Sequence, residues 1–355
     1  MDKEKAIYYI EHSFLASLIE NENVTDITFN GVDIYYVSNI EGRRKADINI
    51  EHQVVKDFLR QIANLTEQQF SYTNPVLDVS VGKYRINATH QSIGKVADDD
   101  VVTFAIRIAS ISPKIEENGD FITKPIVELV NLILQKRLSI VIGGVTGSGK
   151  TEFQKFLLRK MRPNERVIVI DNVMELDMIR SENGIDLTCW KVDEKNIFSS
   201  PAILIKNALR NNPDWLILAE ARDKEMVDVL NSAMTGAPII TTIHAFDAKS
   251  LPFRMARLVL RSDQKLDYDE TLKDIYYHFH FYFYLSKVES NNKITRYISE
   301  VGFIDDSGRY FRLFHRNNKE TFYYPLPTFA YKLLGRPNVS EIFRNTFLKE
   351  VKRDE

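Results

Sequence analysis

The chain has 355 residues, which is room for about two domains of ordinary size. Its hydrophobic content of 44% is that of a globular protein with buried cores, and it excludes a disordered chain. The 47 basic and 49 acidic residues leave a formal charge of −2, so we expect no global electrostatic attraction to nucleic acid or to an anionic membrane.

We expect neither a disulfide nor a segment embedded in a membrane. Cys189 is the single cysteine, which excludes an intramolecular disulfide and fits a reducing cytosol. The N-terminal residues lack the long apolar core of a secretory signal. The best apolar run, residues 126–134, is short and is interrupted by Glu128 and Asn131. Any association with a membrane should therefore be peripheral or through partner proteins.

Residues 1–110 predict a smaller α+β domain. A helical start over residues 5–20 precedes hairpin-like strands within 26–37, and amphipathic spacing predicts a helix over 51–65. Further strands are expected at 76–81, 84–89 and 101–108.

Residues 111–122 predict a linker, because the stretch 112–120 holds a proline, a glycine and four charged side chains. In residues 123–355 strands then alternate with helices, which predicts a mostly parallel sheet with helices on both faces. The strands are expected at 139–143, 166–171, 215–219 and 238–243. The helices are expected near 125–136, 150–161, 201–210, 223–234 and 248–261.

The region from about 275 onward predicts a β-rich extension of this second domain. The residues from Tyr277 to Ser286 alternate in a way that predicts a strand with one apolar and one polar-aromatic face. Turns at Asn291-Asn292 and at 306–308 predict more hairpins. A metal site at His278 and His280 would need a third ligand, which the sequence does not place. The region has no assigned role, and a docking surface is one interpretation.

Residues 144–151 read Gly-Val-Thr-Gly-Ser-Gly-Lys-Thr and carry the strongest functional signal. They match the phosphate-loop pattern G-x-x-x-x-G-K-[ST] at every fixed position, between a strand-like run and a segment with helical spacing. Such a loop wraps a polyphosphate with backbone N–H groups at the positive end of a helix. Lys150 would reach the β- and γ-phosphates, and the Thr151 hydroxyl would ligate Mg²⁺.

Hydrolysis also needs a carboxylate that orients water, and two predicted strands lead to acids. The carboxyl ends of parallel strands face the ligand crevice. Glu220 is our candidate for positioning the attacking water, and capping of the next helix is the alternative. Asp171 and Glu175 follow the other strand, where they either hold the metal and its waters or are merely solvated.

His244 ends a third strand that points at the same crevice. A lone histidine is usually structural. At this position, however, it would sense or stabilise the γ-phosphate as a hydrogen-bond donor.

The order of these features resembles the secretion ATPases of the type II/type IV secretion superfamily. Residues 144–151 resemble the Walker A motif, and Asp-Asn-Val-Met-Glu at 171–175 resembles the acid box. Residues 208–223, with Asp-Trp-Leu-Ile-Leu-Ala-Glu, are close to the Walker B segment and are the most diagnostic match. Residues 235–245 look like the histidine box. The resemblance covers nearly the whole chain and is greatest to the conjugative, type IV branch.

This resemblance implies a RecA-like P-loop ATPase domain after the smaller α+β domain. It also implies ATP and Mg²⁺ as cofactors and a cytoplasmic homohexamer at the inner face of the cell membrane, docked on an inner-membrane complex. An arginine of the N-terminal domain would reach the nucleotide, with Arg107 as the best match and Arg85 behind it. Arg222 is a candidate for completing the site at or across a subunit boundary.

Three positions depart from the family pattern. Asp171-Asn172 stands where the family usually has Glu-Asp, and Ala219 replaces the glycine before the Walker B glutamate. Ala237 stands where many members have a first histidine, so only His244 can carry that box.

We therefore predict an ATP-hydrolysing motor that couples turnover in a hexameric ring to macromolecule translocation or pilus assembly. The predicted catalytic residues are Glu220, Lys150, Glu175, His244 and Arg222. The predicted nucleotide-binding residues are Gly144, Val145, Thr146, Gly147, Ser148, Gly149, Lys150, Thr151, Glu152, Arg107 and Arg85, and those for Mg²⁺ are Thr151 and Asp171.

Three alternatives stay open. The altered acid box favours a nucleotide-gated scaffold with negligible hydrolysis. A motor of type II secretion or of type IV pili would share the same motifs. A DNA-handling motor is disfavoured because the chain is nearly neutral and lacks a basic stripe, and direct nucleic-acid binding is not predicted.

Overall fold

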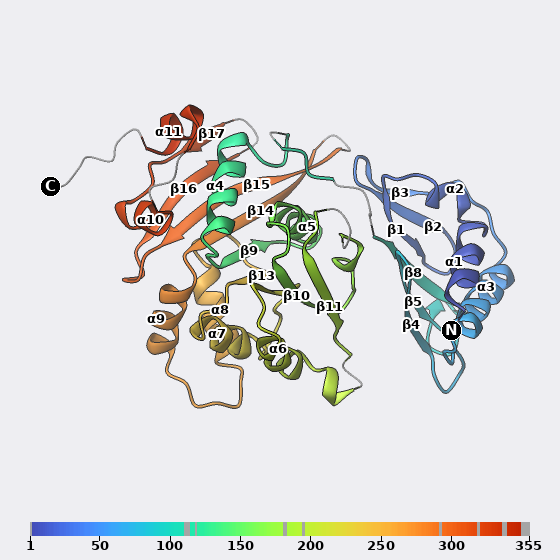
Figure 1. Ribbon diagram of the computed structural model, residues 1–355. Helices are drawn as coiled ribbons and strands as arrows, with labels where there is room; N and C mark the ends of the chain where they lie inside the picture. The colour runs from blue at the N-terminus through green and yellow to red at the C-terminus, as the bar shows by residue number, and fades with distance from the viewer. Residues whose placement is uncertain are drawn as a thin grey trace. The chain divides into compact units, whose positions relative to one another are not determined.

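The computed structural model describes residues 2–109, 114–117, 119–179, 183–193, 196–290, 293–317, 320–335 and 339–348. Residues 111–113 and 118 of the expected linker lie outside the described residues, as does the expected turn at Asn291-Asn292. The chain forms two compact units (Figure 1). The first comprises residues 1–112 and 288–295, and the second comprises residues 113–287 and 296–355.

The described strands of the first unit form an antiparallel six-stranded sheet in the order β3-β2-β1-β8-β5-β4, with three helices on one face (Figure 1). The helices are α1 (Lys3–Glu11), α2 (Ala16–Ile19) and α3 (His52–Leu65). The sheet strands are β1 (Val24–Phe29), β2 (Ile34–Ser38), β3 (Gly42–Lys45), β4 (Val76–Val81), β5 (Tyr84–Thr89) and β8 (Thr103–Ile108), and β6 (Lys95–Val96) pairs with β7 (Asp99–Asp100).

The helix expected over 5–20 is divided in two. The Ser13 hydroxyl donates to the Ile10 carbonyl oxygen (2.7 Å) and accepts from the Leu15 N–H (3.2 Å). Serine side chains that bond to nearby backbone groups in this way compete with the helical ladder, which explains the break.

The described strands of the second unit form a nine-stranded sheet in the order β11-β10-β12-β13-β9-β14-β15-β16-β17. Neighbours from β11 to β14 run parallel, and β15, β16 and β17 are antiparallel to one another. The strands are β9 (Ile140–Gly144), β10 (Arg166–Asp171), β11 (Asp186–Lys191), β12 (Trp215–Leu218), β13 (Ile239–Ile243), β14 (Phe281–Ser290), β15 (Lys293–Ile304), β16 (Tyr310–Arg316) and β17 (Thr321–Tyr323). The helices are α4 (Lys124–Gln135), α5 (Lys150–Lys160), α6 (Pro201–Arg210), α7 (Met226–Met234), α8 (Leu251–Val259), α9 (Tyr268–His278), α10 (Thr328–Leu333) and α11 (Glu341–Phe347), with short 3-10 turns at Asp177–Ile179 and Ile197–Ser199. The strands and helices expected between 123 and 261 all form.

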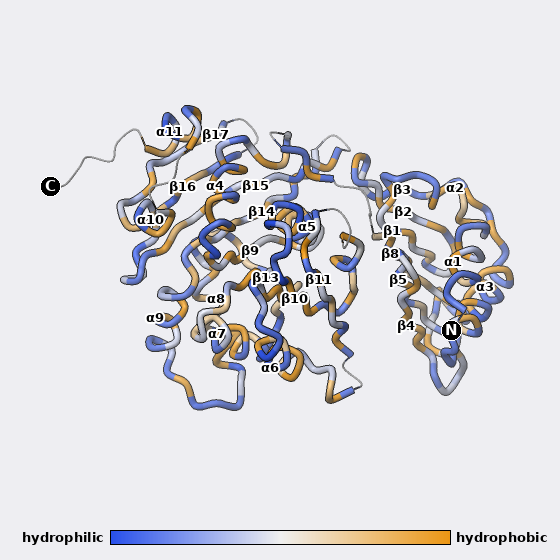
Figure 2. The backbone as a smooth tube through the Cα atoms, in the orientation of Figure 1, coloured by the Kyte–Doolittle hydropathy of each residue, from blue (hydrophilic) through white to orange (hydrophobic). Residues whose placement is uncertain are grey.

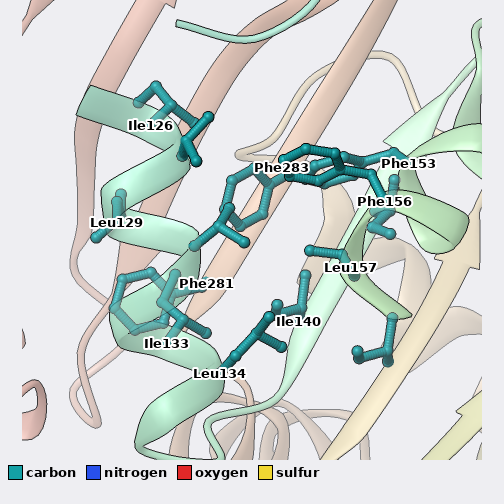
Figure 3. Close-up of a cluster of buried hydrophobic side chains, with 14 of the residues drawn as sticks. Ile126, Leu129, Ile133, Leu134, Ile140, Phe153, Phe156, Leu157, Phe281 and Phe283 are labelled. Atoms are coloured by element: carbon teal, nitrogen blue, oxygen red, sulfur yellow. The ribbon is translucent and has the colours of Figure 1, made fainter. Parts of the chain in front are cut away.

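Two hydrophobic cores lie on the two faces of this sheet. Alternate side chains of a strand point to opposite faces, so Ile140 and Ile142 of β9 pack with α4 and α5, whereas Val141 packs with α6 to α9. Figure 3 shows the first core, where Ile126 and Ile133 of α4 face Phe281 and Phe283 of β14. In Figure 2 hydrophobic and hydrophilic residues alternate along the helices and strands, as elements with one buried and one exposed side require. Helices therefore cover both faces, as the alternation of strands and helices predicts.

The expected strand from Tyr277 is wrong at its start. Residues up to His278 belong to helix α9, which begins at its N-cap Asp267, where the side chain accepts hydrogen bonds from the N–H groups of Asp269 and Glu270. The β-rich extension is also only partly β, because α10 and α11 follow its strands.

Strand β14 is a central strand rather than a surface extension. It pairs in parallel with β9, and Phe281, Tyr282 and Phe283 are all fully buried. Its faces alternate as expected, with Phe281, Phe283 and Leu285 on one side and Tyr282 and Tyr284 on the other, but the polar-aromatic face is covered by the second core instead of being open. The docking-surface interpretation is therefore wrong for this strand.

His280 is buried beside the end of α9, and its Nδ1–H donates to the Ile304 carbonyl oxygen (2.9 Å). Over the described parts of the chain, no group of three or more His, Cys, Asp and Glu side chains gathers in a way that could hold a metal ion. No described helix is both long enough and apolar enough to cross a membrane.

We predict that Phe283→Ala destabilises the second unit by about 3–5 kcal/mol, because it removes a fully buried ring that packs on Phe153 at 5.3 Å. Tyr277→Ala is the control, since its side chain is 64% exposed on α9 and its loss should change the free energy of unfolding by about 0.5 kcal/mol or less. Denaturant unfolding followed by circular dichroism measures both. Equal effects of the two substitutions would contradict the central place of β14.

Candidate functional site

The predicted functional residues follow the ends of three neighbouring strands, all at the same edge of the sheet. Strands β12, β13 and β9 are adjacent and parallel. The Ala221 N–H donates to the Thr242 carbonyl oxygen (2.9 Å), and Ile243 is in register with Gly143. Glu220, His244 and the loop from Gly144 therefore come together, as strand ends in parallel sheets do.

The loop at 144–151 depends on glycine at its two ends. Gly144 has a φ of +152°, and a Cβ there would lie 2.5 Å from the Ser148 Oγ and 2.7 Å from the Leu285 carbonyl oxygen. Gly149 has a φ of +97° and is the N-cap of α5. A side chain at Gly144 would collide with β14, and one at Gly149 would strain the backbone.

The loop has the features of an anion site. The Ser148 hydroxyl is buried, and none of the described residues gives it a hydrogen-bond partner. The N–H groups of the first turn of α5 lie directly after it, and such groups have no acceptor within their own helix. A phosphate supplies the acceptor oxygens that both need, so the loop fits a nucleoside polyphosphate.

Lys150 lies at the centre of the site. Its Nζ donates to the carbonyl oxygens of Gly144 (2.8 Å) and Val145 (3.1 Å) and lies 3.5 Å from the His244 Nδ1. A bound triphosphate would compete with these two carbonyl groups for the same ammonium.

His244 connects the loop to Glu220. Its Nδ1 lies 3.1 Å from the Gly144 carbonyl oxygen, and its Nε2 lies 3.0 Å from the Glu220 Oε1. Carbonyl and carboxylate oxygens both accept hydrogen bonds, so each ring nitrogen of His244 lies beside an acceptor of the site. His244 therefore contacts both the loop and Glu220, which a histidine that only packs in the core would not do.

Glu220 is held in its charged form. Burial raises the pKa of this carboxyl group, but the hydrogen bond from Arg222 (2.7 Å) and the charges of Arg222, His244 and Lys150 outweigh burial and hold the pKa below its usual range. The carboxylate can accept a proton or orient a water molecule.

Asp171 is buried and is bonded to the backbone that follows it. One carboxylate oxygen accepts from the Val173 N–H (2.9 Å) and the other from the Glu175 N–H (3.1 Å). The carboxylate thus fixes the turn that carries the buried Glu175. Each carboxylate oxygen of Asp171 keeps a second lone pair that can accept from another group. That Asp171 and Glu175 hold the metal or its waters therefore stays a prediction.

The other loop residues have distinct settings. Val145, Thr146 and Gly147 are exposed, and Thr151 is half-buried on the first turn of α5. Glu152 forms an ion pair with the buried Lys155 (2.9 Å).

Arg85 and Arg107 lie in the first unit, on the neighbouring strands β5 and β8, directly opposite each other. They point to the sheet face opposite the helices, because Ile86 and Ile106 beside them are in the core that the helices cover. The Arg85 Nε lies 3.7 Å from the Asp78 Oδ1, and Asp26 is in register with Arg107.

One residue that contacts the loop is absent from the sequence prediction. Arg296 of β15 donates from its Nε to the Gly147 carbonyl oxygen (2.7 Å). No local pattern marks it, because only the pairing of β14 with β9 and its place beside β15 bring it to the loop.

A family model described as "Type II/IV secretion system protein" matches residues 115–275, which hold the loop, Glu220 and His244. This part of the chain belongs to the type II/IV secretion family.

Curated relatives are similar to the chain in sequence, and a solved structure is similar to it in fold. The chain is 24% identical over 301 residues to the type IV secretion system protein VirB11 of Bartonella henselae, covering 74% of this chain and 83% of that protein. It is 25% identical over 320 residues to an uncharacterized protein of Bacillus anthracis, covering 85% of this chain and 70% of that one. The ATPase DotB of Legionella pneumophila has a similar fold, with a TM-score of 0.62 and 18% identity over 91% of this chain and 83% of that one.

We predict that Arg222→Gln raises the pKa of Glu220, because the hydrogen bond and charge that oppose burial are lost. In the unchanged protein the ionised carboxylate stabilises the fold above the ordinary pKa of a glutamate, and this contribution is lost as pH falls through the lowered value. A carbon-13 NMR titration of labelled glutamate carboxyl groups measures the shift. Arg261→Gln, which removes a partner of Asp223 (3.3 Å), is the control. An unchanged Glu220 pKa in Arg222→Gln would contradict the assignment.

Proposed function

We propose that the chain is an ATP-hydrolysing motor of a type IV secretion or conjugation apparatus. The observation that carries this proposal is the contact chain from Lys150 through His244 to Glu220, beside a loop that fits a polyphosphate. A binding module needs the loop alone. Hydrolysis needs in addition a carboxylate that orients water and a hydrogen-bond donor beside the phosphates, and Glu220 and His244 would supply these.

In this function the loop and Lys150 hold the phosphates, and the Glu220 carboxylate orients a water molecule for in-line attack on the γ-phosphate. His244 would donate a hydrogen bond to the charge that develops on the phosphoryl oxygens. Arg222 keeps Glu220 ionised, so it acts on the same carboxylate.

Mg²⁺ fits the donor set of the site, because hydroxyl and carboxylate oxygens are its preferred ligands. Thr151 would hold it, with Asp171 and Glu175 as holders of the metal or its waters. When bound, the ion neutralises charge on the phosphates.

The parallel sheet with helices on both faces supports a RecA-like ATPase domain after the smaller α+β domain, with the boundary between 110 and 123. Arg107 and Arg85 would complete the nucleotide site from the N-terminal domain. The relatives' names support secretion as the process. We infer that the protein works as a homohexamer at the cytoplasmic face of the membrane, where its motion would drive macromolecule transfer or pilus assembly.

The decisive experiment measures steady-state ATPase activity of the full chain beside Lys150→Ala and Glu220→Gln. Lys150→Ala should lose ATP binding. Glu220→Gln should still bind ATP, while its kcat falls about 10²-fold or more, because the water is no longer oriented by a carboxylate. Equal, near-zero rates in all three proteins would overturn the motor and support a nucleotide-gated scaffold.

We also expect native mass spectrometry to show six copies in the presence of ATP, since sites completed at subunit boundaries favour assembly when nucleotide is bound. Lys150→Ala is the matched control and should assemble less. A monomer with and without ATP would contradict the ring.

A further inference from the structure

Strand β14 brings a lysine to the outside of the phosphate loop. Its pairing with β9 ends at Leu285, in register with Gly144, so the following residues of β14 run on beside the loop. Lys287 is two residues beyond Leu285 and therefore on the same face of the strand. A Cβ on Gly147 would lie 4.0 Å from the Lys287 Cδ, which places the lysine stem in contact range of the loop.

Strand β15 brings an arginine to the same place. The Arg296 Nε–H donates to the Gly147 carbonyl oxygen at 2.7 Å, and a Cβ on Gly149 would lie 3.9 Å from the Arg296 Cδ. The strand is fixed here, because the N–H of Ile298 donates to the Phe121 carbonyl oxygen (3.0 Å) and its side chain is buried in the core that holds α5. Arg296 therefore reaches the loop from a rigid element.

The bond to Gly147 orients the next amide. The carbonyl and N–H of one trans peptide unit point in opposite directions, so a Gly147 oxygen held by Arg296 turns the Ser148 N–H to the other side. That N–H donates to the Val145 carbonyl oxygen (3.2 Å), across the loop. Gly147 has a φ of +74°, a conformation that strains most side chains and that a charge-assisted hydrogen bond helps to maintain.

We propose that Arg296 is a positioning residue of the nucleotide site, which holds the phosphate loop in the shape that binds a nucleoside polyphosphate, and that Lys287 adds positive charge at the same side. The inference rests on the proposed function. It assigns a role to residues of strands β14 and β15, in the region that the sequence left without one. We expect Arg296 and Lys287 to support the binding of nucleoside diphosphates and triphosphates alike, because loop shape and charge act on phosphates that both carry.

The test is titration of the full chain with fluorescent ATP and ADP analogues, together with steady-state ATPase kinetics. Arg296→Gln should weaken the binding of both nucleotides about tenfold or more and raise KM, with kcat changed about twofold or less. Arg296→Lys should recover part of the affinity, because it restores the charge without the planar guanidinium. Lys287→Gln should weaken binding less, and its effect should shrink as salt is added.

Arg309→Gln is the matched control, since Arg309 is exposed in the turn between β15 and β16 and lies over Phe311. It should leave affinity, KM and kcat unchanged. The inference is overturned if Arg296→Gln and Lys287→Gln bind nucleotide as tightly as the control does. A weakening in Arg296→Gln that Arg296→Lys does not relieve also overturns it. If Arg296→Gln does not fold, the Arg296→Lys and Lys287→Gln variants decide. An unchanged protein that binds no ATP overturns the proposed function instead.

Discussion

The site depends on the position of β9 between β13 and β14. Parallel pairing on both sides fixes where β9 ends, and the absence of a side chain at Gly144 lets that end lie against the backbone of β14. One neighbour then supplies His244, and the other leads to Lys287. The loop is thus held from both sides by strands that are distant in the sequence. Its conformation depends on these neighbouring strands as well as on its own residues.

Charge in the site is balanced locally. The carboxylate of Glu220 meets Arg222 and His244, and the ammonium of Lys150 meets two backbone carbonyl groups. Asp214, at the opposite end of β12 from Glu220, forms an ion pair with Arg137 (2.6 Å) and accepts from the Arg166 N–H. The two acids at the ends of β12 therefore have different roles. Asp214 links neighbouring strands, and Glu220 faces the phosphate loop.

Much of this was predictable because its signals are local. The loop motif and the apolar runs of β10, β12 and β13 fixed those strands, and parallel strand ends then predicted that Glu220 and His244 would meet at the loop. Only the start of the aromatic run was misread, because alternation of large side chains does not distinguish a strand from the end of a helix, and the cap at Asp267 was the missed signal. Arg296 was beyond reach, since the sequence alone does not reveal which strand pairs with β9.

The hydrogen bonds of Lys150 have a consequence for how tightly the loop can hold a nucleotide. Because its ammonium is already satisfied by the carbonyl groups of Gly144 and Val145, gaining a phosphate means giving up these partners. Affinity is then the difference between two sets of bonds rather than the full strength of one. When a nucleotide leaves, the lysine can return to these backbone partners. For the proposed motor, this exchange lowers the free-energy cost of nucleotide release.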